Sequence, residues 1–319
     1  MSNFSGATVA GCGRYNAAVR RLIVNADDFG LTPGINRAIA EAHSRGIVTS
    51  ATLMANSSAF ENAVELTSGL PQLSVGCHVI LVDGAPLLER SQVKSLISSN
   101  ASGPVQFHTS LATFAGRALT GQFDESQIEA EATAQIQKLQ ASGIVVSHLD
   151  THKHTHIFPA VARPLLRAAK ACGVPAVRNP FSSRAALSAG LVRTRPTLWK
   201  RYLQMRALSR LRMRFLRLVA ETRMLTTDGS LGVLTTGMLD PELLEKEIGS
   251  IAPGIWELVC HPGYSDADLD RVKTRLRQSR FEELNLLTSF EVRAALSRRG
   301  VELLSYRELA ASGRPRLAM

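Results

Sequence analysis

Short apolar runs alternate with amphipathic segments along most of the chain. Strand-like runs lie at residues 22–28, 48–55, 73–81, 144–150, 176–180, 231–235, 256–262 and 302–306. Helical spacing of apolar residues is found near residues 32–44, 59–68, 125–141, 159–172, 240–249 and 288–299. Strands that alternate with helices are typical of a parallel sheet with helical crossovers. The pattern therefore predicts an α/β fold, an irregular (β/α) barrel of the TIM type.

Two predicted connections, 82–124 and 181–230, are too long for simple loops of such a barrel. We expect one domain over residues 21–312 with a helical insertion at about 182–225, because 319 residues suffice for one large core. Residues 1–20 and 313–319 are expected to be flexible tails. No stretch reaches the roughly 18 apolar residues of a membrane span, so the sequence predicts a soluble protein.

The formal net charge of +10 comes mainly from one segment. Residues 193–223 hold ten Arg and Lys side chains against one acid, Glu221, interleaved with Leu, Trp, Tyr, Met and Phe. This is typical of a basic amphipathic helix or helical pair. Three interpretations remain open: a solvated insertion packed on the barrel, a lid or contact with an anionic membrane surface, and a nucleic-acid contact. Nucleic acid is the least favoured, because no recognition motif accompanies the charge.

The four cysteines are scattered and form no C-x-x-C pair. This spacing indicates neither a disulfide framework nor a structural zinc knuckle. A reducing, cytoplasmic location fits best, with peripheral membrane attachment left open.

Four predicted strands end in ionisable residues: Asn25-Ala26-Asp27-Asp28, His78, the run from His148 to His156, and Cys260-His261. Because strand ends converge on one face of a (β/α) barrel, these groups are expected to meet. In an extended chain the alternating residues of the third group share one side: His148, Asp150, His152, His154 and His156. Carboxylate and imidazole ligands together suit zinc, with manganese, iron, cobalt or nickel as substitutes.

Each of these groups also has a simpler interpretation. Asp27 and Asp28 could complement the N-terminus of the next helix. His78 could be a hydrogen-bonded core residue, and the histidine run a solvated loop.

Four motifs together resemble the YdjC-like carbohydrate deacetylases, the ChbG/HpnK group: NADDFG (25–30), SVGCHVILVDG (74–84), SHLDTHKHTH (147–156) and LVCHPG (258–263). The resemblance runs from about residue 21 to 308, and Cys77 stands where the family often has Leu or Met. It implies a deacetylase barrel of the NodB type that holds one divalent metal ion. Zinc or magnesium is expected, with manganese, cobalt, nickel or iron as alternatives. The implied ligands are Asp28, His78 and His152.

The same resemblance, extended to the more distant NodB-like deacetylases, implies further roles. Asp27 would be the catalytic base, although the roles of Asp27 and Asp28 could be exchanged. Arg178-Asn179-Pro180 matches the R-x-P motif of those relatives and would place Arg178 at the substrate, or it is a charged strand end before a proline turn.

Three further residues complete the expected site. His261 is the candidate general acid, because imidazole titrates near neutral pH, and His154 is both its rival and a candidate substrate-binding residue. Asp150 is expected to orient a ligand histidine through the far ring nitrogen.

The expected reaction is hydrolysis of the acetamide of an N-acetylhexosamine unit, in a carbohydrate or a glycolipid, with release of acetate. In the hopanoid-associated branch of the family the sugar is carried on a lipid, which a basic membrane-facing insertion would suit. Alternatives are metal-dependent hydrolysis of a phosphoester or cyclic amide, and a non-catalytic basic protein that binds membranes or nucleic acid. A homo-oligomer is left open.

Overall fold

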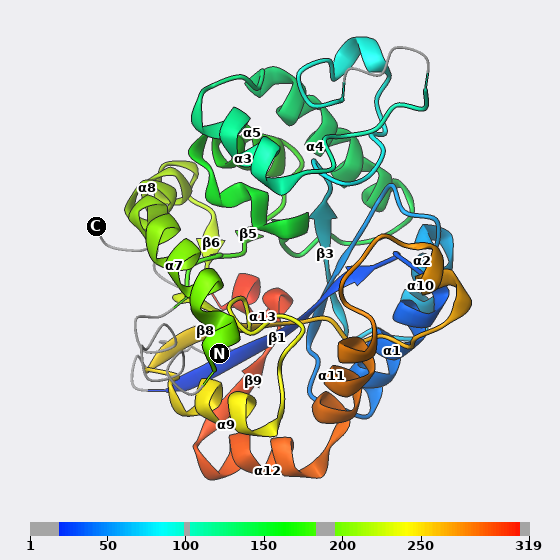
Figure 1. The fold of residues 1–319 in the computed structure, drawn as a ribbon. Coiled ribbons are helices and arrows are strands. Elements are labelled where there is room, and N and C mark those ends of the chain that lie inside the picture. The colour runs from blue at the N-terminus through cyan, green and yellow to red at the C-terminus, as the bar shows by residue number, and fades with distance from the viewer. Residues whose placement is uncertain (1–18, 99–102, 183–194, 313–319) are drawn as a thin grey trace, which may run out of the picture.

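The structure, a computed structural model, describes residues 19–98, 103–182 and 195–312. Within these ranges nine strands form one sheet in which neighbouring strands are parallel (Figure 1). The strands are β1 (Arg20–Phe29), β2 (Ser50–Leu53), β3 (Ser74–Val79), β4 (Leu149–Thr151), β5 (Ala176–Val177), β6 (Leu225–Thr226), β7 (Gly229–Leu231), β8 (Gly254–Cys260) and β9 (Val301–Leu304).

The sheet is curled, so that its two end strands come close together (Figure 1). Its order is β6-β5-β4-β3-β2-β1-β8-β7, with β9 also paired to β1. The two end strands, β6 and β7, are separated in the chain only by Thr227 and Asp228, so they must lie next to each other. This confirms the predicted irregular α/β barrel, whose helical crossovers require parallel pairing.

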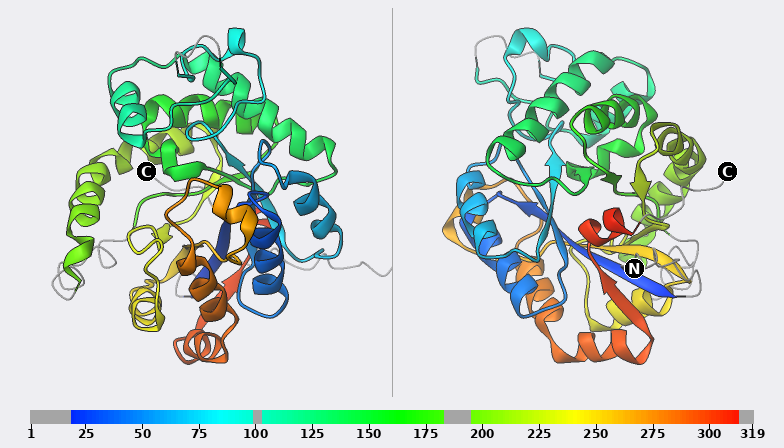
Figure 2. Two further views of the ribbon diagram at one scale, coloured as in Figure 1. Left: turned by 45° about the vertical axis from the view of Figure 1, so that its right-hand side comes forward. Right: turned by 180° about the vertical axis from the view of Figure 1, so that it is seen from behind.

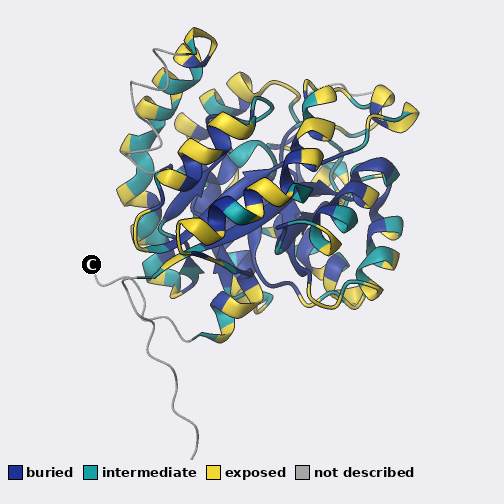
Figure 3. Ribbon diagram, turned by 90° about the horizontal axis from the view of Figure 1, so that it is seen from below, coloured by how far each residue is buried: buried dark blue, intermediate teal, exposed yellow. Residues whose placement is uncertain are grey.

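Helices surround the sheet on its outer side (Figures 1 and 2). The described α-helices are α1 (Pro33–Ser44), α2 (Phe60–Ser68), α3 (Leu111–Leu119), α4 (Glu125–Ala141), α5 (Pro159–Ala171), α7 (Trp199–Leu208), α8 (Arg212–Thr222), α9 (Pro241–Gly249), α10 (Ala267–Arg271), α11 (Gln278–Thr288), α12 (Phe290–Arg298) and α13 (Tyr306–Ala311). Figure 3 shows the strands in the buried interior and the exposed outer faces of the helices. The central strand β1 is buried from Leu22 to Phe29, so its carboxyl end delivers polar residues into the interior.

Most predicted elements have counterparts, with three corrections. The strand predicted at 231–235 lies at Gly229–Leu231, and the strand predicted from residue 144 begins only at Leu149. Helices α3, α10, α11 and α13 and the strand β6 were not predicted. Residues 1–18 and 313–319, which make up nearly all of the expected tails, and 183–194 of the expected insertion lie outside the described residues. No helix of the described chain is long and apolar enough to cross a membrane.

The basic segment folds into α7 and α8. Helix α8 packs on α5 and buries Phe215 and Val219, whereas α7 buries none of its side chains. In the left-hand view of Figure 2, α7 runs along the outer edge of the molecule. The segment is therefore anchored through α8 and presents most of α7 to its surroundings.

Candidate metal centre

The end of β1 places Asp27 and Asp28 in the barrel interior, 2% and 3% exposed. The backbone turns at Asp28, which has a φ of 65°. Left-handed backbone is unusual for residues other than glycine and is often kept at functional sites. Three more such residues, Asp83, Lys153 and His154, lie in the segments that follow β3 and β4. Unfavourable backbone conformations thus gather where the strand ends meet.

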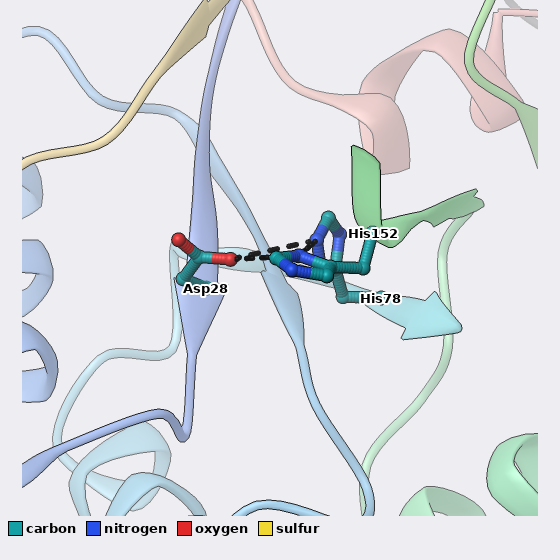
Figure 4. A group of neighbouring side chains, drawn as sticks. All are labelled: Asp28, His78 and His152. Carbon is teal, nitrogen blue, oxygen red and sulfur yellow. Dashed lines mark hydrogen bonds and ion pairs between the residues drawn. The ribbon is translucent and has the colours of Figure 1, made fainter. Parts of the chain in front are cut away.

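Asp28, His78 and His152 bring three possible ligand atoms together (Figure 4). Oδ1 of Asp28 lies 3.6 Å from Nε2 of His78 and 3.4 Å from Nδ1 of His152. The two imidazole nitrogens are 3.4 Å apart. Ligand atoms placed tetrahedrally at zinc bonding distances of about 2.1 Å are separated by about 3.4 Å, so the three separations fit one metal ion.

Asp150 orients the ring of His78. Its Oδ1 lies 2.6 Å from Nδ1 of His78, so that nitrogen carries a proton and Nε2 faces Asp28. Burial alone would lower the pKa of His78. The negative charges of Asp150, Asp27 and Asp28 outweigh this effect and raise the pKa to about 9. Nε2 therefore lies in a strongly negative environment that favours a proton or a metal ion at this position.

Arg178 fixes the carboxylate of Asp27 by hydrogen bonds. Its Nη1 and Nη2 donate to the two oxygens of Asp27 at 2.8 and 2.6 Å, and its Nε donates to Glu257 at 2.8 Å. Nη1 also pairs with Asp150. Burial would raise the pKa of Asp27, but Arg178 and His78 hold it far below its usual range. Arg178 is fully buried and paired with three carboxylates, so it orients Asp27, and its contact with substrate stays a prediction.

The alternation predicted for the histidine run ends at Thr151. Lys153 and His154 adopt φ values of 56° and 54°, and residues 152–157 form a tight helical turn in place of a strand. The chain therefore leaves the extended conformation just after the strand. His152 remains at the centre of the site, and the later histidines no longer follow strand alternation.

The other histidines of the run have separate surroundings. His148 stacks on Tyr306 and contacts Asn25, with Nε2 3.0 Å from Oδ1. His156 lies against Phe215 and Thr151. His154 is half-buried, and burial, together with Arg178, lowers its pKa to about 3.

His261 follows β8 and lies beside Asp27, with Nε2 3.8 Å from Oδ2. Burial lowers its pKa to about 4, against the attraction of Asp27 and Asp28. The imidazole is therefore neutral at pH 7. Its Nδ1 is buried and has no hydrogen-bond partner among the described residues.

Besides Glu257 on β8, two residues of the site escaped sequence analysis, Arg280 and Glu283. Both lie on α11 and are 1% and 2% exposed. Arg280 donates from Nη2 to Oδ2 of Asp28 at 2.5 Å, and Glu283 accepts from the backbone N–H of His261 at 2.6 Å. The available signal was the helical spacing of Arg280 and Glu283 with Leu284 and Leu287, which places the two charged residues on the apolar side of the helix.

The charges around the site are those that a divalent cation would balance. Four buried carboxylates face two buried guanidinium groups: Asp27, Asp28, Asp150 and Glu257 with Arg178 and Arg280. Buried carboxylates therefore outnumber buried guanidinium groups, and buried charge is costly unless it is compensated. Both the separations of the donor atoms and this charge therefore fit a divalent metal ion.

The fold and this cluster define a class, an α/β barrel with a candidate metal centre at its strand ends. The chain matches the model of the YdjC-like protein family over residues 21–298. The chain therefore belongs to the YdjC-like family, which confirms the resemblance found in its motifs.

Similar proteins cover almost all of the chain. It is 33% identical over 290 residues to a carbohydrate deacetylase of Geobacillus stearothermophilus, covering 91% of this chain and 98% of that one. It is 30% identical to carbohydrate deacetylase 1 of Listeria innocua, covering 91% and 100%. A crystal structure from Enterococcus faecalis, of a protein provisionally assigned to cellobiose-phosphate cleavage, shares 27% identity and a TM-score of 0.69, with 91% and 99% covered.

Proposed function

We propose that this chain is a metal-dependent carbohydrate deacetylase that removes the acetyl group from an N-acetylhexosamine unit and releases acetate. The relatives named carbohydrate deacetylase support deacetylation of a carbohydrate. The observation that carries the proposal is the meeting of Asp28, His78 and His152 beside a second carboxylate, Asp27. Amide hydrolysis needs an electrophile for the carbonyl and a base for water, and this arrangement offers both.

In this proposal Asp28, His78 and His152 hold the metal ion, with Asp150 orienting His78. The bound ion would polarise the acetyl carbonyl and favour deprotonation of water. Zinc or magnesium is proposed, and manganese, cobalt, nickel or iron would suit the same donors.

Asp27 is proposed as the general base. Arg178 fixes both of its oxygens and keeps it ionised at neutral pH, which orients Asp27 toward its role but makes it a weak base. Because the pKa of Asp27 is low, Asp27 must pass the accepted proton to another group soon after it accepts it. His261, 3.8 Å away, is neutral at pH 7 and would take this proton and give it to the departing amine.

His154 is proposed as a substrate contact rather than the acid. It is half-buried after His152, whereas His261 lies beside Asp27. Its pKa of about 3 keeps it neutral, so it could hydrogen-bond a sugar hydroxyl.

The test is incubation of the purified protein with soluble and lipid-linked N-acetylglucosamine compounds, followed by assays of acetate and free amine. Equal amounts of both, lost on treatment with EDTA and restored by a divalent metal, are expected. Phosphate release without acetate would instead favour a phosphoesterase. A protein that binds metal but releases no acetate from any compound would contradict the proposed reaction.

We further propose that α7 and α8 contact an anionic membrane surface. Trp199, Leu203 and Met213 are 53%, 57% and 70% exposed, and arginines are interleaved with them. Each Arg or Lys near an anionic bilayer contributes about 1 kcal/mol, and tryptophan favours the interface. Nucleic acid would use the charge but gain less from the apolar side chains.

Sedimentation with phosphatidylserine vesicles at low and high salt tests this contact. Binding at low salt is expected to be lost at high salt and in the Arg206→Gln, Arg210→Gln, Arg214→Gln and Arg217→Gln variant. The control replaces Arg45 and Arg271, exposed arginines outside this segment, with Gln. No vesicle binding at low salt would leave a solvated insertion, and binding of RNA in place of vesicles would favour nucleic acid.

A further inference from the structure

Helix α11 carries two buried ionisable side chains that face the candidate metal centre. Arg280 and Glu283 are three residues apart and therefore lie on the same side of the helix. Arg280 contacts the side chain of Asp28, and Glu283 contacts the backbone of His261. Burying two charged side chains on one helix is costly, and each is compensated by a group of the site.

The two oxygens of Asp28 have different partners. Oδ1 lies 3.4 to 3.6 Å from the nitrogens of His152 and His78. Oδ2 accepts from Nη2 of Arg280 at 2.5 Å and points to a different side of the carboxylate. A carboxylate that is held in this way can offer one oxygen to a metal ion but not both.

Arg280 is itself held firmly. Its Nε donates to the carbonyl of Leu276 at 3.2 Å, and its own carbonyl accepts from Gly263 at 3.1 Å. A Cβ at Gly263 would lie 2.9 Å from Cδ of Arg280, so the loop after His261 packs directly on this side chain. The guanidinium therefore has little freedom to release Asp28.

We propose that Arg280 is a positioning residue that restricts Asp28 to single-oxygen coordination of the metal ion. This proposal rests on the proposed function, because it takes Asp28 to be a ligand of the metal ion. Its consequence is a low coordination number, which leaves a position for water or the acetyl oxygen. With a two-oxygen carboxylate this position would be filled.

Electrostatics alone predicts a different result from positioning. As a nearby positive charge, Arg280 repels a cation, so its removal should tighten metal binding without changing the coordination number. As a positioning residue, it also controls how many oxygens bind. The coordination number, and not the affinity, therefore separates the two roles.

The test uses Co²⁺ as the probe, because four- and five-coordinate Co²⁺ absorbs visible light much more strongly than six-coordinate Co²⁺. Wild type, Arg280→Met, Arg280→Lys and, as a control, Arg277→Met are titrated with Co²⁺, and absorbance is expressed per bound ion. Arg277 precedes the same helix and pairs with Asp270 on the surface. Absorbance per ion should fall in Arg280→Met, return in Arg280→Lys and stay at the wild-type value in Arg277→Met.

An unchanged spectrum per bound ion in Arg280→Met would overturn the proposal, whatever the affinity. If that variant does not fold, Arg280→Gln takes its place in the same comparison, with the same fall in absorbance per bound ion expected. Absence of Co²⁺ binding in wild type would remove the metal site and this role together. Acetate release is measured separately, so failure of the deacetylase reaction with an intact spectrum is recognised as such.

Discussion

Replacement of Arg178 by Met removes the one positive charge shared by three buried carboxylates, Asp27, Asp150 and Glu257. Met keeps much of the apolar stem, so the change is mainly in charge and hydrogen bonding. Removing one partner of a buried ion pair typically costs about 3–5 kcal/mol. Against a usual unfolding free energy of about 5–15 kcal/mol, this loss is large but leaves a measurable folded population.

The loss should depend on pH. In wild type the pKa of Asp27 is depressed, so its contribution to stability is present above its unfolded pKa of about 3.9 and is lost as the pH falls through the folded value. Without Arg178, the burial that opposes ionisation of Asp27 is less compensated, and the variant is expected to gain less stability than wild type as the pH rises. The difference in stability between Arg178→Met and wild type should therefore be larger at pH 8 than at pH 5.

Urea unfolding of the metal-free proteins at pH 5 and pH 8 measures both effects. Arg167→Met is the matched control, because Arg167 pairs with Glu125 and Glu129 on the surface and its side chain is 41% exposed. Its replacement should cost less than about 1 kcal/mol at either pH. A stable Arg178→Met protein with a raised KM would refute the charge-balance argument and restore a substrate contact.

Three further outcomes are expected. Elemental analysis should find large losses of bound metal in His78→Ala and His152→Ala, and full retention in both would exclude them as ligands. Asp27→Asn should keep its metal and lose most acetate release, because an amide cannot accept the proton. If Asp27→Asn lost its metal and Asp28→Asn did not, the roles of the two aspartates would be exchanged. Burial raises the pKa of Glu247 to about 7, so wild type should lose stability from about pH 4.5 to 7, by about 3 kcal/mol. Urea unfolding should show a gain of this size above pH 7 in Glu247→Gln, absent in the exposed control Glu245→Gln; parallel pH curves for wild type and Glu247→Gln would contradict it.

The meeting of Asp28, His78 and His152 could be predicted because it depends on barrel topology. Each of these residues lies at or just after a strand end, and the parallel order brings such ends to one face. The exact length of each strand matters little to this argument.

The positions of His154 and His156 could not be predicted, because they depend on the backbone turn at Lys153. Period-2 alternation holds only while the chain stays extended, and no glycine or proline marks the turn. Lys is also an uncommon residue for left-handed backbone, so the sequence carries no warning of it.

Helix α11 was missed for a related reason. Its buried face includes Arg280 and Glu283, which interrupt the apolar pattern by which helices are recognised. These charges are buried because Asp28 and the backbone of His261 compensate them. Such compensation between distant segments appears only once the fold is known.

The left-handed backbone at Asp28 limits how this position can diversify. Aspartate and asparagine are among the few residues with side chains that adopt this conformation readily, and asparagine lacks the charge. Glutamate would keep the charge but meet both a less tolerant backbone and a longer reach toward His78. Glycine would suit the backbone and supply no ligand. Selection for the fold and selection for the chemistry therefore favour the same residue. Each single replacement of Asp28 would lose either the backbone conformation or the metal ligand.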